Sequence, residues 1–167
     1  MKSIEQFLDE MNRNGWSPVP YKHHPHHIKS AIKACGLKPA AKQCYANSQR
    51  CVALQELVEL QYAEGVVLTD IGFPLQHAWI VDSEGKNHDL TLHPIPKILC
   101  MKVYNKKEVR KSLIEKREYN QIDMVWCDIM YTAVCMNLPL DLPFEEIKQL
   151  TTQTFEKIKQ LTTQTLE

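Results

Sequence analysis

The sequence predicts an α+β domain, and three features of the 167-residue chain lead to this class. Helical patterns, in which apolar residues recur every three to four positions, fill most of the first 60 residues. Strand-like segments follow between residues 62 and 104, separated by turn signals, and helical patterns return after them. Because the strands follow one another without intervening helices, we expect an antiparallel sheet with helices before and after it, rather than an alternating βαβ fold.

Three helices are expected before the sheet. A capping box at Ser3 begins the first helix, and Gly15 ends it. Residues 16–27 are rich in proline and histidine, and their prolines exclude regular structure there. A short helix is then expected over residues 28–35, and the longest helical pattern of the body of the chain runs over residues 42–60.

Four strands and two further helices complete the expected body of the protein, which we take to be a single domain over residues 1–142. The strands are expected over residues 62–68, 76–82, 86–92 and 98–104, and the helices over residues 106–117 and 121–136.

The end of the chain is a tandem repeat. The sequence FEEIKQLTTQT at residues 144–154 recurs as FEKIKQLTTQT at residues 155–165. An 11-residue period places the apolar side chains in one nearly straight stripe along a helix. We therefore expect a helical tail over residues 143–167. It either lengthens a C-terminal helix by duplication or supplies a surface for self-association into a homo-oligomer.

The turn at residues 83–85 sets the register of the hairpin formed by the second and third expected strands. A two-residue turn would force a glutamate into positive φ, so a three-residue turn with Gly85 in the left-handed conformation is the better fit. In that register Trp79 faces Asp89, and His77 lies on the same face as Asp89, one diagonal away. Turn chemistry alone therefore predicts a pair between a histidine and a carboxylate.

Charge and composition limit the classes of partner and the cellular compartment that we expect for this protein. The 20 Lys and Arg residues balance the 20 Asp and Glu residues, so the chain has no net field to hold it on nucleic acid or on an anionic membrane. No apolar run approaches the length of a membrane span, and the N-terminus lacks the apolar core of a signal peptide. We therefore expect a cytoplasmic protein with no nucleic-acid or membrane partner, whose six cysteines are thiols.

The sequence gives no reason to expect a metal or another cofactor. The cysteines form no CxxC pair. Imidazoles are good ligands for transition metals, but the segment His23-His24-Pro25-His26-His27 contains a proline and no acidic or cysteine ligand. We interpret it as a surface loop that binds metal only adventitiously. His88 is expected to be exposed, on the opposite face of its strand from Asp89.

Cys44 differs from the other five cysteines, which are interpreted as small, buried hydrophobic residues. It lies at the start of the expected long helix, where the helix dipole and unpaired backbone N–H groups favour the thiolate. The same N–H groups can stabilise an oxyanion. With His77 as a base and Asp89 beside it, the chain has the components of thiol catalysis.

A set of motifs in fixed order carries a resemblance to a known family. The motifs are Cys44-Tyr45-Ala46-Asn47, Tyr62-Ala63-Glu64-Gly65, Pro74-Leu75-Gln76-His77-Ala78-Trp79, Gly85 and Asp89-Leu90-Thr91. They resemble the core of transglutaminase-like and papain-like cysteine hydrolases, most closely that of small bacterial and phage proteins. The resemblance implies a papain/transglutaminase-like core, in which an N-terminal catalytic helix packs on a small antiparallel sheet. It also implies that Cys44 is the nucleophile, that His77 is the base, and that Asp89 orients the imidazole with its Nε2 free.

The implied function is that of a thiol-dependent hydrolase or acyltransferase acting on an amide, ester or thioester. The substrate would be a protein, a peptide or a small amide or ester. The reaction would be that of a peptidase, an amidase or deamidase, or a transglutaminase-like enzyme. We expect Gln43 to add an oxyanion donor and Asn47 and Trp79 to lie beside the site, while Glu64 either faces outward or accepts hydrogen bonds there. The alternative is a non-catalytic, phage-encoded binding protein that uses the same fold and the C-terminal helix to sequester or dock a partner.

Overall fold

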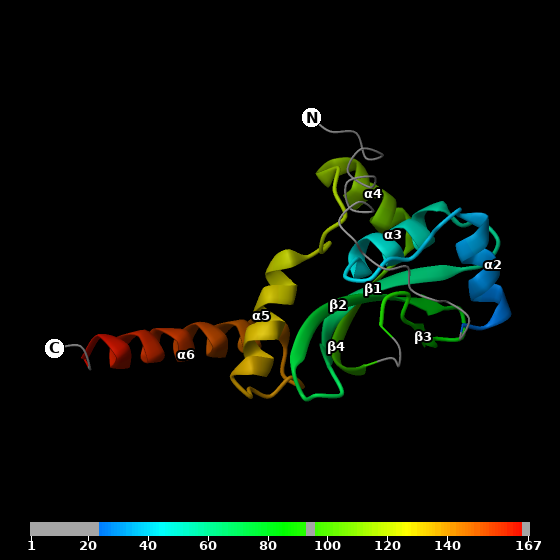
Figure 1. Cartoon of the computed structure of the whole chain (residues 1–167). Coiled ribbons are helices and arrows are strands. Elements are labelled where there is room, and N and C mark those ends of the chain that lie inside the picture. Colours follow the sequence, from blue (N-terminus) through cyan, green and yellow to red (C-terminus); the bar gives the residue numbers. More distant parts are fainter. Residues whose placement is uncertain (1–23, 93–95, 165–167) are drawn as a thin grey trace.

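The computed structural model describes residues 24–92 and 96–164 and is an α+β structure, as predicted. Within these residues it contains five helices and four strands, and the helices precede and follow the sheet (Figure 1). The expected first helix, together with His23 and His93, lies outside the described residues. Among the described residues, no helix combines the length and the apolar character that crossing a bilayer requires.

The strands form one curled antiparallel sheet in the order β3-β2-β1-β4 (Figure 1). Their bounds are Leu60–Leu68 for β1, Pro74–Asp82 for β2, Asn87–His88 for β3 and Lys97–Tyr104 for β4. β1 is central and pairs with β2 on one side and with β4 on the other, where a bulge falls between Val66 and Val67.

The hairpin between β2 and β3 has the register that the turn chemistry predicted. Ile80 pairs with His88, the Gly85 N–H donates to the Asp82 carbonyl at 3.0 Å, and Gly85 has a φ of 77°. The prediction of a three-residue turn is therefore confirmed. The paired strand is shorter than expected, however, because the ladder ends at His88. Beyond this point the carboxylate of Asp89 accepts the N–H groups of Thr91 and Leu92, the second of which a longer ladder would have used.

Helices α2 (His26–Ala34) and α3 (Cys44–Leu54) cover one face of the sheet (Figure 1). Their buried side chains form the main core with apolar residues of β1 and β2, among them Ile28, Ile32, Cys51, Val52, Tyr62, Ala78 and Ile80. Helix α2 begins two residues earlier than expected, so His26 and His27 belong to a helix and not to the expected surface loop. Pro25 occupies the N-cap position, and its ring excludes helix only before itself. Helix α3 ends at Leu54 rather than near Leu60. There the side-chain oxygen of Gln55 accepts the Val58 N–H at 3.0 Å and turns the chain towards β1.

The remaining helices are α4 (Lys106–Lys116), α5 (Met124–Cys135) and α6 (Phe144–Gln164). Helices α5 and α6 form a separate core with β1 of the sheet, to which Val66, Met130, Ala133 and Ile147 contribute buried side chains. The tandem repeat forms one continuous helix, α6, which runs outward past α5 (Figure 1). Whether residues 1–142 form a unit separate from residues 143–167 stays a prediction, and Ile147 of α6 is 2% exposed against α5.

Candidate functional site

The first residue of α3 is Cys44, and the backbone before it turns sharply into the helix. Lys42 has a φ of 64°, in the left-handed region that costs energy for a residue with a side chain, and Gln43 has φ −118° and ψ 41°. The Cys44 side chain is partly buried. The first N–H groups of a helix have no acceptor within it. Cys44 therefore lies where unpaired backbone donors and the positive end of the helix dipole meet.

His77 and Asp89 form a buried pair on the opposite arms of the hairpin region. His77 Nε2 lies 2.5 Å from Asp89 Oδ2, and the two side chains are 2% and 1% exposed. The His77 ring stacks on Trp79, with ring centroids 6.2 Å apart. The predicted contact between this histidine and this carboxylate is therefore present, on the face that the register assigned to both.

Asp89 is held by the backbone that follows it. Its Oδ1 accepts the N–H groups of Thr91 at 2.7 Å and of Leu92 at 2.8 Å, and its Oδ2 is directed to the imidazole. Because each oxygen has its own partners, rotation of the carboxylate would break at least one hydrogen bond. The third residue of the Asp89-Leu90-Thr91 motif thus contributes to the orientation of the first.

The His77 ring also interacts with Cys44. Burial alone would lower the pKa of His77, but hydrogen bonds to Asp89 and then to Cys44, together with their charges, raise it from 6.5 to about 9. The orientation of the ring differs from the one expected from the resemblance. Nε2 is engaged by Asp89, so Nδ1 is the ring nitrogen that Asp89 leaves available.

Asn47 connects the start of α3 to the segment that carries Asp89. Its Nδ2 donates to Thr91 Oγ1 at 2.9 Å and to the Ala40 carbonyl at 2.8 Å, and its Oδ1 accepts the Ala40 N–H at 3.1 Å. β3 ends at His88, so this segment passes along an edge of β2 that carries no paired strand. Asn47 therefore holds the Cys44 helix against the part of the sheet where the histidine and the aspartate meet.

Gln43 and Trp79 are both buried. Gln43 is 9% exposed, and its Nε2 has no hydrogen-bond partner within the described part of the chain. A buried donor of this kind is available to an oxygen of a bound molecule. Trp79 is 1% exposed, packs with Ala63, and donates its indole N–H to Asn87 Oδ1 at 2.8 Å. Both therefore remain candidates for the lining of the site.

Glu64 has a different set of contacts. It pairs with Ala78 in the β1–β2 ladder, so its side chain leaves the face opposite to that of His77. The side chain is fully buried and accepts four hydrogen bonds, from Tyr62, Tyr104 and the N–H groups of Ile122 and Asp123. These contacts join β1 to the start of α5. A role for Glu64 in lining the site stays a prediction.

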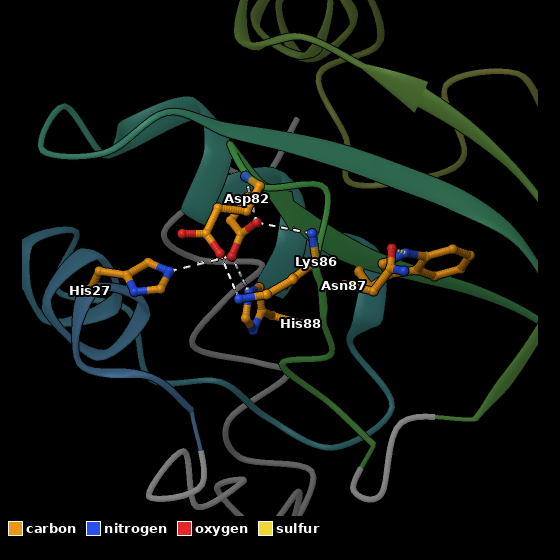
Figure 2. A network of polar contacts seen from close by, with 7 residues as sticks. His27, Asp82, Lys86, Asn87 and His88 are labelled. Atoms are coloured by element: carbon orange, nitrogen blue, oxygen red, sulfur yellow. Dashed lines mark hydrogen bonds and ion pairs between the residues drawn. The ribbon is translucent and has the colours of Figure 1, made fainter.

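A second cluster of polar residues was not predicted from the sequence. His27 of α2, Asp82 of β2 and His88 of β3 converge on the face of the sheet opposite to His77 (Figure 2). His88 was expected to be exposed, and this was wrong, because α2 covers that side of the hairpin and leaves the residue 6% exposed. The hairpin register could have indicated that Asp82 and His88 share a face. No local pattern could have brought His27 to them.

Comparison of the chain with protein-family models, curated proteins and solved structures finds no match. The interpretation of the site therefore depends on its own geometry.

Proposed function

We propose that this protein is a thiol-dependent hydrolase or acyltransferase with a papain/transglutaminase-like arrangement of Cys44, His77 and Asp89. The observation that carries the proposal is the buried imidazole of His77, which contacts the Asp89 carboxylate at 2.5 Å and whose pKa is raised by Asp89 and by the helix-start thiol of Cys44. A lone strand histidine or a lone cysteine has many structural explanations. An imidazole held between the two is the arrangement that nucleophilic thiol catalysis needs.

In the proposed reaction His77 acts as an acid in the first half and as a base in the second, while Cys44 forms and then loses a bond to the acyl group. In the reactive form the thiol proton of Cys44 already lies on His77, and the sulfur of the resulting thiolate forms a bond to the carbonyl carbon of an amide, ester or thioester. The carbonyl electrons move to the oxygen, which the N–H groups at the start of α3 stabilise, with the Gln43 amide as an additional donor. The imidazolium then protonates the leaving amine, alcohol or thiol as its bond to the carbonyl carbon breaks. Water or an amine, deprotonated by His77, releases the acyl group and returns the thiol.

The electrostatics of the pair support the charged state that this chemistry requires. A pKa of about 9 for His77 keeps the imidazole protonated at neutral pH, beside the Asp89 carboxylate. All six cysteines are free, which suits the reducing cytoplasm that we propose as the compartment.

Selective alkylation tests the proposal without knowledge of the substrate. The wild-type protein is treated with iodoacetamide at pH 7, and the rate at each cysteine is followed by peptide mass spectrometry. Cys135 was expected to be buried, and this was wrong, because the side chain is exposed on α5; it therefore serves as the internal reference. We expect Cys44 to react at least tenfold faster than Cys135 although it is less accessible, and His77→Gln to remove most of that difference. The expected acceleration is that of a thiolate in an electropositive setting.

The proposal fails if Cys44 reacts no faster than Cys135 and if the His77→Gln substitution leaves its rate unchanged. His77→Gln keeps a side chain of similar size that can still hydrogen-bond Asp89. Asp89→Asn provides a second variant, in which the imidazole is kept and its acceptor is weakened. Circular dichroism of both variants separates loss of reactivity from loss of folding.

A second candidate function is that of a non-catalytic interaction protein. The observation that favours it is on α6, where Phe155, Ile158 and Leu161 are at least half exposed. Apolar side chains at helical spacing on an exposed face are characteristic of helices that dock a partner or a second copy. On this hypothesis Cys44→Ala leaves association unchanged, whereas substitutions in the second repeat abolish it.

A further inference from the structure

Three donor atoms from separate elements meet beside the β2–β3 hairpin. Asp82 Oδ2 lies 2.8 Å from His88 Nε2 and 3.5 Å from His27 Nε2, and all three atoms lie within 4.8 Å of one another (Figure 2). Asp82 and His88 are each 6% exposed, whereas the His27 side chain is 46% exposed. The cluster therefore has a buried base and one side open to solvent.

The hairpin turn orients the carboxylate of this cluster. Asp82 Oδ1 accepts the N–H groups of Glu84 and Lys86, each at 2.9 Å, which directs Oδ2 towards the two imidazoles (Figure 2). His88 is packed between this carboxylate and the ring of His27, whose centroid lies 5.9 Å away in an edge-on arrangement. Two of the three donors are thus fixed by the fold before any ligand binds.

Ion pairing alone accounts for only part of this geometry. The Asp82–His88 distance is that of a good hydrogen bond, but 3.5 Å from His27 Nε2 to the same oxygen is too long for one. Two imidazole nitrogens directed at one carboxylate oxygen instead leave room for a cation bound by all three. Metal–nitrogen and metal–oxygen bonds of about 2.0–2.2 Å place neighbouring donors about 2.8 to 3.1 Å apart in octahedral sites and about 3.3 to 3.6 Å apart in tetrahedral sites. The observed 2.8 Å and 3.5 Å lie close to these intervals, and the exposed His27 ring has space to adjust.

We propose that His27 Nε2, Asp82 Oδ2 and His88 Nε2 bind one divalent transition-metal ion of the zinc type. Two imidazoles and one carboxylate suit zinc and its borderline neighbours, whereas magnesium and calcium take mainly oxygen ligands. The remaining coordination position faces the open side and takes water. The backbone bonds of Asp82 Oδ1 are the outer contacts that fix the orientation of a metal-binding carboxylate.

The ion would join α2 to the hairpin. His88 directly precedes Asp89, so a metal on His88 would hold the strand that presents the proposed catalytic carboxylate from its other face. The three ligands and the three proposed catalytic residues are different side chains. A test of the metal site is therefore independent of a test of the proposed function, and either proposal can fail without the other.

Titration with zinc alone tests the site. The full-length chain is purified without a histidine tag, treated with a chelator, kept reduced, and titrated by calorimetry, with bound metal counted after dialysis. His27→Ala removes the exposed ligand without opening the core, and His26→Ala is the matched control on the same turn of α2. We expect one zinc per chain, an affinity at least tenfold lower in His27→Ala, and an unchanged affinity in His26→Ala. Asp82→Asn, which keeps the side-chain oxygen for the turn, should also lose at least tenfold.

Cobalt provides a second readout, because its visible spectrum reports the ligands directly. We expect visible ligand-field bands without the near-ultraviolet charge-transfer band of a thiolate ligand. Three results would overturn the proposal. They are binding that is not stoichiometric, an equal loss of affinity in His26→Ala and His27→Ala, and a thiolate band showing that the free cysteines hold the ion. The second of these would mark an adventitious, histidine-rich surface.

Discussion

Asp82 and Asp89 have the same arrangement at two points of one short hairpin region. Each uses Oδ1 to accept two backbone N–H groups, and each presents Oδ2 to an imidazole, that of His88 or that of His77. A carboxylate held in this way has its second oxygen aimed by the backbone rather than by packing. This geometry explains how two histidines on opposite faces of the hairpin acquire defined partners from two aspartates that are seven positions apart.

The raised pKa of His77 makes folding stability depend on pH. Burial opposes the charged ring, but hydrogen bonds to Asp89 and Cys44 outweigh it and raise the pKa from 6.5 to about 9. The folded state therefore holds this proton more tightly than the unfolded chain does. The resulting stabilisation is fully present below about pH 6.5 and is lost as the pH rises through 9.

We predict that the difference in unfolding free energy between wild type and His77→Gln shrinks by up to about 3 kcal/mol between pH 6 and pH 10, at 1.36 kcal/mol per pKa unit. Urea denaturation at several pH values measures it. Groups that titrate in this range and do not interact with His77 are common to both proteins, so their contributions cancel. A difference that stays constant over the whole range would show that the ring does not hold its proton in the folded state.

At the scale of elements, Glu64 is the principal polar link between the sheet and α5. It lies in the middle of β1 and accepts the N–H groups of Ile122 and Asp123, each at 2.8 Å, just before α5 begins. The hydroxyl groups of Tyr62 and Tyr104 complete its set of donors. The four donors satisfy the hydrogen-bonding capacity of the buried Glu64 carboxylate. A side chain with fewer acceptor sites at this position would leave buried donors without a partner.

We predict that Glu64→Gln lowers the unfolding free energy by about 2 to 4 kcal/mol, because the amide NH₂ faces donors and leaves buried N–H groups without an acceptor. Glu59→Gln is the matched control, since Glu59 is an exposed residue immediately before β1. Chemical denaturation of the three proteins gives the comparison. Equal stability of Glu64→Gln and Glu59→Gln would contradict the assigned role.

The elements could be predicted from the sequence, but their ends could not. Strand composition and the Gly85 turn are local signals, and they gave the β2–β3 register and with it the contact between His77 and Asp89. The ends of α3 and β3 depend instead on side chains that take over backbone hydrogen bonds, at Gln55 and Asp89. Hydrophobic periodicity carries no information about such bonds. The position of His27 beside Asp82 depends on the packing of α2 on the sheet, which only the folded chain defines.

At the scale of the whole molecule, the two nearly identical repeats of α6 lie in different environments. The repeats of α6 are nearly identical, yet Ile147 of the first copy is 2% exposed and its equivalent in the second, Ile158, is 50% exposed. The first copy packs against α5, and the second extends beyond it (Figure 1). The difference arises from position alone, since the residues are the same. The repeat therefore allows burial to be tested with matched substitutions.

We predict that Ile147→Ala lowers the unfolding free energy by about 2 to 5 kcal/mol, as truncation of a buried isoleucine does, whereas Ile158→Ala changes it by less than about 0.5 kcal/mol. Thermal and urea denaturation measure both. If the second copy serves self-association, Ile158→Ala also shifts sedimentation velocity towards the monomer at concentrations where the wild type associates. A stability loss in Ile158→Ala that matches the loss in Ile147→Ala and does not vary with protein concentration would mean that the second repeat packs within its own chain. The helical tail would then be part of the folded body, because its apolar stripe would be supporting the same core as the first copy.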